Sequence, residues 1–221
     1  MHVGGNRLTS SAIAERLPDT LFHVKPAWIQ AAGYSGIEPD ETQIELMDRY
    51  RTWLTTEGFS AGGVGTNEPE QLDRRHLGDS LLFASQFPPY VPEVWDLGSG
   101  VGLPGIPLAI LLPTTEFVLI DRSGRRCHLL RRVVRILDLP NCRVEQTDIE
   151  DLEGTVDVMV SRASLPPEAL GAVVERHLNP GGVAVAAGSW CKRPDFEDWT
   201  TVEIPPDALD QTIWLLIMRR Q

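Results

Sequence analysis

The sequence of 221 residues predicts an α/β protein built on a mostly parallel sheet. Three observations predict it: short apolar runs alternate with helical segments after Pro92, a glycine-rich loop follows the first of these runs, and two strand-like runs end the chain without a helix between them. Buried parallel strands are continuous apolar runs, and their connecting helices cover the sheet. Since a typical domain has about 150 residues, the length allows one domain and an appendage.

Composition excludes several classes of protein. With 42% hydrophobic and 23% charged residues, the chain can bury a large core, unlike disordered or fibrous proteins. The net charge of −11 argues against a surface that is basic throughout, although a local basic patch remains possible. The three cysteines are Cys127, Cys142 and Cys191; their separation excludes a disulfide framework or a metal knuckle and favours the reducing cytoplasm. The apolar runs are much shorter than the ~20 residues of a membrane helix, so we expect no membrane partner.

Residues 1–90 are predicted to form an N-terminal helical extension packed on a core domain that spans 91–221. Glycines and prolines interrupt residues 1–40, so we expect short helical pieces there and a mobile extreme N-terminus. Further along, apolar residues recur at three- and four-residue steps, which is the helical period. The predicted helices span Glu41–Thr56 and Asp73–Phe87, and glycines make 57–67 a flexible loop between them.

The core domain is predicted to alternate strands with helices. The strands are expected at Val94–Leu97, Phe117–Ile120, Cys142–Glu145, Val156–Val160, Val183–Ala187, Thr201–Ile204 and Thr212–Met218, and the helices at Leu103–Leu112, Arg125–Leu137 and Pro167–His177. Only a proline-containing turn separates the last two strands, so they should pair antiparallel at one edge of the sheet. A seven-stranded, mostly parallel sheet with an antiparallel terminal strand is the Rossmann-like architecture of class I methyltransferases.

A glycine-rich loop lies between the first strand and the first helix of this domain, with the sequence Asp96-Leu-Gly98-Ser-Gly100-Val-Gly102-Leu-Pro104-Gly105. Its glycines allow positive φ angles and a close approach of the backbone to a ligand. Dinucleotide-binding proteins use a similar loop, but a carboxylate at Asp96 would repel a pyrophosphate and would suit the ammonium and sulfonium groups of S-adenosyl-L-methionine. Asp121 ends the next strand, where an acid can hold ribose hydroxyls. The loop therefore predicts S-adenosylmethionine as the cofactor.

The segment from Asp96 to Ile110 resembles the signature loop of the ribosomal RNA small subunit methyltransferase G family, also called glucose-inhibited division protein B. Three further segments resemble the family in the same order, namely His76-Leu-Gly-Asp79-Ser80-Leu81, Leu119-Ile-Asp121-Arg-Ser-Gly124-Arg125-Arg126 and Ser161-Arg162-Ala163. The resemblance implies methyl transfer to N7 of a guanine in 16S rRNA. It also implies that Gly98, Leu103, Ile149, Glu150 and Arg162 contact the cofactor, which adds to Gly100, Asp96 and Asp121.

Arginines are concentrated between Asp121 and Asp138, where the chain has no other acid. Such a run can be a solvated helix face, or it can hold RNA phosphates beside the mouth of the cofactor site. We expect Arg122, Arg125 and Arg126 to bind RNA, together with Lys192 and Arg193 after the fifth strand. Trp190, in the same stretch, suits the substrate side or plain packing equally well.

Arg162 follows the fourth strand, near the expected point of methyl transfer, and is the predicted catalytic residue. The alternative is a structural ion pair with Asp79 or Glu150. His76 and Asp79, three residues apart on one helix, suit capping or packing better than catalysis. No group of histidines, cysteines and acids has the spacing of metal ligands, so no metal is expected.

Guanine N7 has a lone pair and no proton, so its methylation needs alignment and exclusion of water but no general base. We therefore expect an enzyme that acts on 16S rRNA or the small ribosomal subunit, located in the cytoplasm, as a monomer. Two alternatives stay open. One is a class I methyltransferase with a small-molecule substrate, which the acidic charge favours, and the other is a non-catalytic nucleoside- or RNA-binding module on the same fold.

Overall fold

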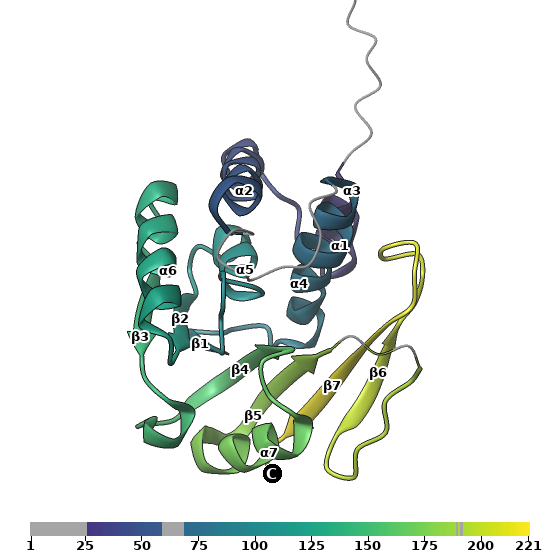
Figure 1. Ribbon diagram of the computed structural model, residues 1–221. Helices are drawn as coiled ribbons and strands as arrows, with labels where there is room; N and C mark the ends of the chain where they lie inside the picture. Colours follow the sequence, from purple (N-terminus) through teal and green to yellow (C-terminus); the bar gives the residue numbers. More distant parts are fainter. Residues whose placement is uncertain (1–25, 59–68, 189, 191) are drawn as a thin grey trace, which may run out of the picture.

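One seven-stranded sheet with the order β3-β2-β1-β4-β5-β7-β6 forms the centre of the computed structural model, which describes residues 26–58, 69–188, 190 and 192–221 (Figure 1). Its strands are β1 (Glu93–Leu97), β2 (Glu116–Asp121), β3 (Cys142–Gln146), β4 (Val156–Arg162), β5 (Leu178–Ala187), β6 (Thr200–Ile204) and β7 (Ile213–Arg219). Strands β1 to β5 pair in parallel, whereas β7 runs antiparallel to both β5 and β6. The predicted class I methyltransferase architecture is confirmed.

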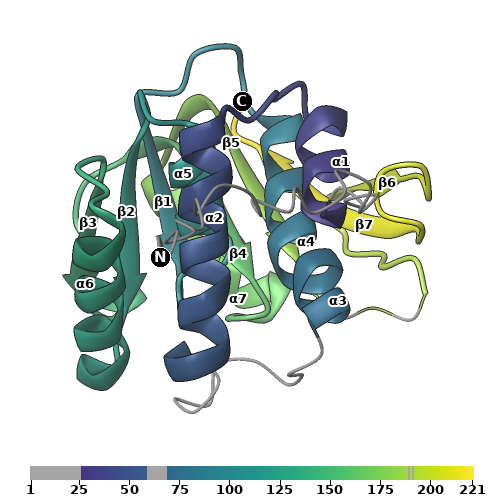
Figure 2. The same ribbon diagram turned by 90° about the horizontal axis from the view of Figure 1, so that it is seen from above.

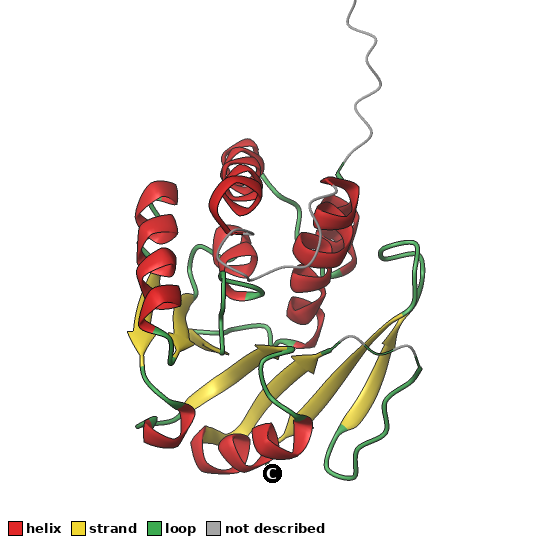
Figure 3. Ribbon diagram, in the orientation of Figure 1, coloured by secondary structure: helices red, strands yellow, loops and turns green. Residues whose placement is uncertain are grey.

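Helices cover both faces of this sheet, as Figure 3 shows by colour. The face that carries α7 (Pro167–His177) is opposite the one that carries the other long helices (Figures 1 and 2). Those on the second face are α1 (Ala27–Tyr34), α2 (Glu41–Trp53), α5 (Gly105–Leu111), α6 (Gly124–Leu137) and a composite segment from Pro69 to Gln86. The composite segment consists of α3 (Pro69–Leu72), a π-helical turn η3 (Asp73–Gly78), α4 (Asp79–Leu81) and a 3-10 turn η4 (Leu82–Gln86).

Alternate residues of the strands divide the core into two hydrophobic clusters. Phe117 and Leu119 of β2 pack with the helices of the N-terminal part, whereas Val118 and Ile120 pack on the face of α7. Successive side chains of a strand point to opposite faces, and both faces are buried here. The run of apolar residues at 117–120 is explained by this double burial.

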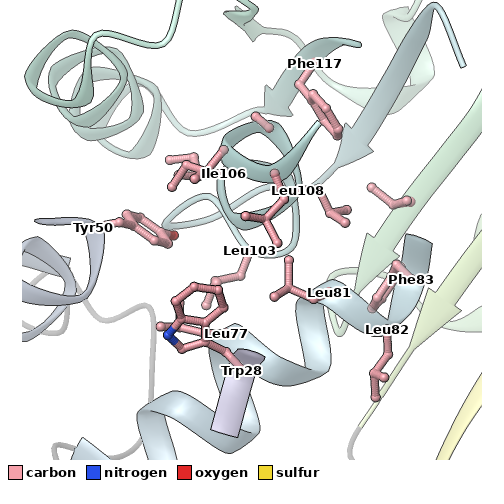
Figure 4. Packing of buried hydrophobic residues seen from close by; sticks show 14 of the residues in the cluster. Trp28, Tyr50, Leu77, Leu81, Leu82, Phe83, Leu103, Ile106, Leu108 and Phe117 are labelled. Carbon is pink, nitrogen blue, oxygen red and sulfur yellow. The ribbon is translucent and has the colours of Figure 1, made fainter. Parts of the chain in front are cut away.

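The described N-terminal helices have no core separate from that of the sheet. Trp28, Tyr50 and Leu77 are fully buried in the same cluster as Leu103 and Ile106, and Figure 4 shows these side chains close together. Burying a large apolar side chain contributes ~1.5–3 kcal/mol, so these contacts attach the extension firmly to the domain.

Local signals explain where several helices begin. The side chain of Asp40 accepts the Gln43 N–H (2.8 Å), the Gln43 side chain accepts the Asp40 N–H (3.0 Å), and this reciprocal cap starts α2. The Ser123 hydroxyl accepts the N–H of Arg126 at 3.5 Å and starts α6. The helical period alone predicted both helices to within a few residues.

Several predicted boundaries differ from the structure, among them the start of the composite segment at Pro69 instead of Asp73 and the end of β4 at Arg162 instead of Val160. The helix after the glycine loop begins at Gly105 instead of Leu103, because residues 98–104 form the loop itself. Strand β5 begins at Leu178 instead of Val183, since its first half contains a proline and two glycines, which are not typical of a strand. A π-helical turn, η1 (Leu54–Gly58), extends α2. The expected pieces in residues 1–25 and most of the loop at 57–67 lie outside the described residues.

Candidate active site

A cavity of about 1010 Å³ lies at the edge of the sheet where the parallel strands end. Residues that follow β1, β2, β3, β4 and β5 line it, together with the composite helical segment and the start of β7. Strand β7 reaches this edge with its first residues because it runs antiparallel to β5. In open α/β sheets, ligands bind in a crevice at the carboxyl ends of the strands.

The glycines of the loop after β1 differ in what surrounds them. Gly98, Gly100 and Gly102 all have positive φ angles, of 72°, 62° and 100°. A Cβ atom on Gly98 would lie 2.3 Å from the Cβ atom of Ser164, so Gly98 lets the loop after β4 pack closely. A Cβ atom on Gly100 would meet nothing nearer than 3.9 Å. Gly100 therefore presents its backbone to the open space of the cavity.

Helix α2 and strand β2 hold this loop from two sides. The hydroxyl of buried Tyr50 donates to the carbonyl of Val101 at 3.0 Å, and Ile120 accepts the N–H groups of Gly98 (2.8 Å) and Ser99 (3.0 Å). Leu103 is 8% exposed and points among Tyr50 and the other buried residues of its cluster (Figure 4). Loop conformation is thus fixed by the core.

Asp121 ends β2 at the cavity wall, as predicted from its position. One carboxylate oxygen accepts the N–H of Gly100 at 3.0 Å, and the other accepts the N–H of Ser123 at 2.8 Å. Arg126 lies 3.6 Å from the same carboxylate. An acid fixed in this way can accept hydrogen bonds from the hydroxyl groups of a ligand.

Asp96 was predicted to face the cofactor, but the structure places it behind the glycine loop. Its side chain is fully buried and is not part of the cavity wall. One carboxylate oxygen accepts the N–H of Gly105 at 3.0 Å, which ties the loop to the start of α5. Burial raises the pKa of Asp96 to about 7, while the hydrogen bond from Gly105 opposes this shift.

The chain after β3 adds a further part of the wall. Ile149 lines the cavity as predicted, whereas Glu150 is exposed and lies outside its lining. Thr147 and Asp148, which the sequence analysis did not single out, line the cavity beside Ile149. Both residues directly follow the third strand, and this position could have placed them at the site, since every parallel strand ends at this edge of the sheet.

Arg162 connects the end of β4 to the π-helical turn η3. Its guanidinium group donates to the carbonyls of Arg75 and His76, the latter at 3.3 Å, and lies 3.7 Å from a carboxylate oxygen of Asp79. The Arg162 side chain is only 16% exposed, although the residue lines the cavity. The ion pair that the sequence analysis held as an alternative is present, with Asp79 and not Glu150 as the partner.

Burial shifts the pKa values of the groups around Arg162. It raises the pKa of Asp79 to about 7, although Arg162 and Arg75 lower it. Burial also lowers the pKa of His76 to about 4, and Arg162 and Arg75 add to that shift. His76 is therefore neutral near pH 7.

The predicted RNA-binding residues divide into two groups. Arg122 and Arg126 line the mouth of the cavity, and the side chain of Arg122 is 82% exposed beside Asp148, at 3.8 Å. Arg125, Lys192 and Arg193 are exposed but do not line the cavity.

The opposite end of the cavity contains residues that the sequence analysis did not assign to the site. Trp190, which was considered for the substrate side or for packing, lines the wall after β5. Gln211 to Trp214 line it at the start of β7. The predicted antiparallel direction of the last strand could have indicated Gln211 to Trp214, because an antiparallel strand begins at the edge where the parallel strands end.

The residues present fit a nucleoside cofactor. A side chain at position 100 would project into the cavity, and glycine leaves this space open for a ligand. Asp121 lies beside Gly100, and its carboxylate accepts the N–H of Gly100. Within the described ranges, no cluster of three or more histidines, cysteines and acids could hold a metal ion. The helices in these ranges are all too short or too polar to cross a membrane.

Comparison with solved structures finds similar folds. The structure of ribosomal protein L11 methylase from Lactobacillus delbrueckii subsp. bulgaricus superposes with a TM-score of 0.52 at 16% identity, covering 72% of this chain and 81% of that one. A chain of the fibrillarin/Nop5p complex gives a TM-score of 0.50 at 17% identity, over 71% and 87% of the two chains. These similarities concern the fold alone.

Sequence comparison identifies nearer relatives. Ribosomal RNA small subunit methyltransferase G of Acidothermus cellulolyticus is 39% identical over 144 residues, which are 64% of this chain and 63% of the relative. The protein of the same name from Stenotrophomonas maltophilia is 37% identical over 171 residues, or 74% and 79% of the two chains. The match thus spans less than two thirds of the Acidothermus protein and about half of a relative from Frankia casuarinae.

The family model described as rRNA small subunit methyltransferase G (GidB) matches residues 43–193. This stretch contains the glycine loop, Asp121, the turn after β3 and Arg162, and therefore most of the cavity wall. With more than half of its length matched, around this loop and on this fold, the chain belongs to the rRNA small subunit methyltransferase G family.

Proposed function

We propose that this protein transfers a methyl group from S-adenosylmethionine to N7 of a guanine in 16S rRNA. The observation that carries the proposal is the open backbone of Gly100 next to the fixed carboxylate of Asp121, in a chain of this family. The substrate would be the rRNA or the small ribosomal subunit, and the enzyme would act as a monomer in the cytoplasm.

Residues of the glycine loop and of the two following strand ends would hold the cofactor. Gly98, Gly100 and Leu103 would contribute backbone groups, Asp121 would accept ribose hydroxyls, and Ile149 would pack on the adenine. Asp96 and Glu150 would act indirectly, Asp96 by holding the loop and Glu150 from the turn next to Ile149.

S-adenosylmethionine supplies an electrophilic methyl group, and guanine N7 supplies a lone pair that carries no proton. No residue has to remove a proton from the attacking atom, so the protein has to align the two partners and exclude water. The loop held by Tyr50, Ile120 and Asp96 supplies this rigidity.

Arg162 would act as a positioning residue. Its donors are engaged with backbone carbonyls of η3, so the role that fits is holding Arg75 and His76 at the cavity wall. Arg122, Arg125, Arg126, Lys192 and Arg193 would contact RNA phosphates and set the orientation of the RNA.

A matched pair of glycine substitutions tests the cofactor site. Gly100→Ala and Gly181→Ala both place a side chain at a positive φ, of 62° and 83°, and neither Cβ atom meets a protein atom closer than 3.9 Å. Only Gly100 faces the cavity. We expect S-adenosylmethionine to raise the melting temperature of the parent and of Gly181→Ala but not of Gly100→Ala, and NAD to stabilise none of them.

The substrate is tested by mapping N7-methylguanosine in 16S rRNA from cells with and without the protein. We expect one modification to disappear without it and to return with the Gly181→Ala variant but not with Gly100→Ala. Unchanged methylation in cells that lack the protein would contradict the RNA substrate. Cofactor binding with no change in the rRNA would instead favour a small-molecule acceptor.

A further inference from the structure

The order of the strands divides the cavity into two halves. One half lies on the side of β2 and β3, where Asp121 ends β2 and Asp148 and Ile149 follow β3. The other half lies on the side of β5 and β7, where Gly188 follows β5 and Trp214 is near the start of β7. The first half contains the acid and the turn that suit a nucleoside. At about 1010 Å³, the cavity is at the upper end of the ~300–1,000 Å³ typical of a site for one small ligand, so a second ligand has room in the other half.

Trp214 is the unusual residue of this second half. It is the second residue of β7, it is partly buried, and it lines the cavity. The chain has six tryptophans, all of them described, and Trp214 alone belongs to neither hydrophobic cluster. Tryptophan has a large apolar surface that is normally packed. The ring at Trp214 therefore lacks the core packing of the four buried tryptophans, and Trp190 is only partly buried at the edge of one cluster.

A second indole, that of Trp190, lines the same half of the cavity just after β5. A Cβ atom added to Gly188 would lie 2.9 Å from two ring atoms of Trp190, so this ring lies directly over the backbone of Gly188. The pairing of β5 with β7 ends at Ala186 and Leu216, and continuing it by two residues sets Gly188 opposite Trp214. Trp190 and Trp214 thus reach one region of the wall from two strands.

We propose that Trp214 and Trp190 form the subsite for the acceptor base, where a purine unstacked from the RNA is held by its flat face. Sequence-specific RNA recognition uses unstacked bases that stack on aromatic side chains and form hydrogen bonds along their edges. Gln211 and Thr212 line the cavity beside Trp214 and supply polar groups for such an edge. Arg75, also on the wall and exposed, provides positive charge for an adjoining phosphate.

This inference rests on the proposed function and extends it to the choice of substrate. Gln211, Thr212 and Trp214 lie beyond residue 193, where the match to the family ends. Most of the part that would select the base therefore lies outside the match, with Trp190 inside it, whereas the part that would hold the cofactor lies within the match.

The experiment compares Trp214→Ala, Trp214→Phe and Tyr90→Ala with the parent protein. Tyr90 is a suitable control because it is 80% exposed and precedes β1, at the sheet edge opposite the cavity. Affinity for 16S rRNA is measured with S-adenosylhomocysteine bound, and KM and kcat are measured for methylation. We expect Trp214→Ala to weaken rRNA binding and raise KM by about five- to a hundredfold, the range for one stacked base. Trp214→Phe, which keeps a flat ring, should recover most of the affinity, and cofactor affinity should change less than about twofold in every variant.

A second readout does not depend on methylation. Guanosine 5′-monophosphate should quench the tryptophan fluorescence of the parent and of Tyr90→Ala, and the quench should be reduced in Trp214→Phe. If the parent methylates 16S rRNA and Trp214→Ala behaves like it, the subsite is wrong and the proposed function stands. If the parent leaves 16S rRNA unmethylated while the quench depends on Trp214, the proposed function is wrong and the subsite stands. Loss of cofactor affinity in both Trp214 variants would also overturn the subsite.

Discussion

At the scale of single residues, the carboxyl group of Asp96 makes the stability of the fold depend on pH. Burial raises its pKa to about 7, whereas an aspartate in an unfolded chain titrates near pH ~3.9. The folded state therefore binds this proton more tightly. The stability that it contributes is complete below about pH 4 and is lost as the pH rises through 7.

Replacing Asp96 with asparagine tests this coupling. The amide oxygen can still accept the N–H of Gly105, but no ionisation remains. We expect the free energy of unfolding of Asp96→Asn, relative to the parent, to rise by up to about 1.4 kcal/mol per pH unit between pH 4 and 7. Asp79 also makes the fold less stable as the pH rises, and His76 makes it more stable. Both contributions are present in the parent and in the variant, so they drop out of the difference between the two proteins. Urea unfolding at several pH values measures it.

Exposed Asp195 provides the control for this titration. Asp195→Asn measures the effect of the same substitution at an exposed position. A difference curve for Asp96→Asn that is no steeper than the one for Asp195→Asn would contradict the raised pKa, and a large loss of cofactor affinity in Asp96→Asn would indicate direct contact with the ligand.

The position of Asp96 also shows a limit of sequence reasoning at this scale. Its place two residues before Gly98 marks it as part of the loop, but the pattern does not state to which side a strand-end carboxylate points. The N–H of Gly105 is nine residues further on, and only the folded loop brings the two together. Asp121 does line the cavity, where the N–H groups of Gly100 and Ser123 hold its carboxylate, and this orientation too is seen only in the folded chain.

At the scale of secondary structure elements, Arg162 joins β4 to the π-helical turn η3. Removing it leaves the buried carboxyl of Asp79 without its cation and two carbonyls without their donor. Breaking a buried ion pair by removing one partner costs ~3–5 kcal/mol. We expect Arg162→Ala to be destabilised by this amount, Asp79→Asn by less, and the double variant to show a coupling of ~0.5–3 kcal/mol.

The coupling should depend on pH, because it requires the ionised form of Asp79. With a pKa raised to about 7, that carboxyl is mostly charged at pH 8 and mostly neutral at pH 5.5, so the coupling should be larger at pH 8. The pair of Arg74 and Asp210, which is closer to solvent, serves as a control, with an expected coupling of at most ~1 kcal/mol. Additive effects of Arg162→Ala and Asp79→Asn at pH 8 would contradict the connection.

Periodicity predicts elements better than it predicts their internal geometry. The helix predicted at Asp73–Phe87 is present as a helical segment, but the π and 3-10 turns within it are not distinguishable from apolar spacing. Those turns place the carbonyls that Arg162 binds. Trp214 was not assigned to the site although the antiparallel direction of the last strand was predicted, because its place at the cavity depends on where β7 begins and not on its own neighbours in sequence.

At the scale of the whole molecule, the alternation of strands and helices predicted the parallel sheet, and the missing last crossover helix predicted its antiparallel end. The order of the strands was not predicted, and it comes from the structure. Nor could the sequence predict which basic residues surround the cavity. Arg122 and Arg126 line its mouth, whereas Arg125 is on the same helix turn but lies outside the lining. The net charge of −11 gives no guide to this local distribution.

The distribution of charge, and not its total, should govern RNA binding. Arg125 and Arg126 are exposed at the start of α6, next to the cavity edge of the sheet. Arg176 and Arg219 are equally exposed but lie at the end of α7 and the end of β7, at the opposite edge. Replacing either pair with alanine changes the net charge by the same two units.

We expect the two double variants to differ in the salt dependence of rRNA binding. Each phosphate contact on a single strand contributes about 0.7 to the slope of log K against log salt, so losing Arg125 and Arg126 should flatten the slope by about 1.4. Losing Arg176 and Arg219 should leave the slope unchanged, since charges more than ~10 Å from the RNA are largely screened at 0.1 M salt. Filter binding of 16S rRNA over a salt series measures both slopes. Equal flattening in the two variants would mean that the RNA responds to the overall charge of the protein, and would contradict a binding surface at this edge of the sheet.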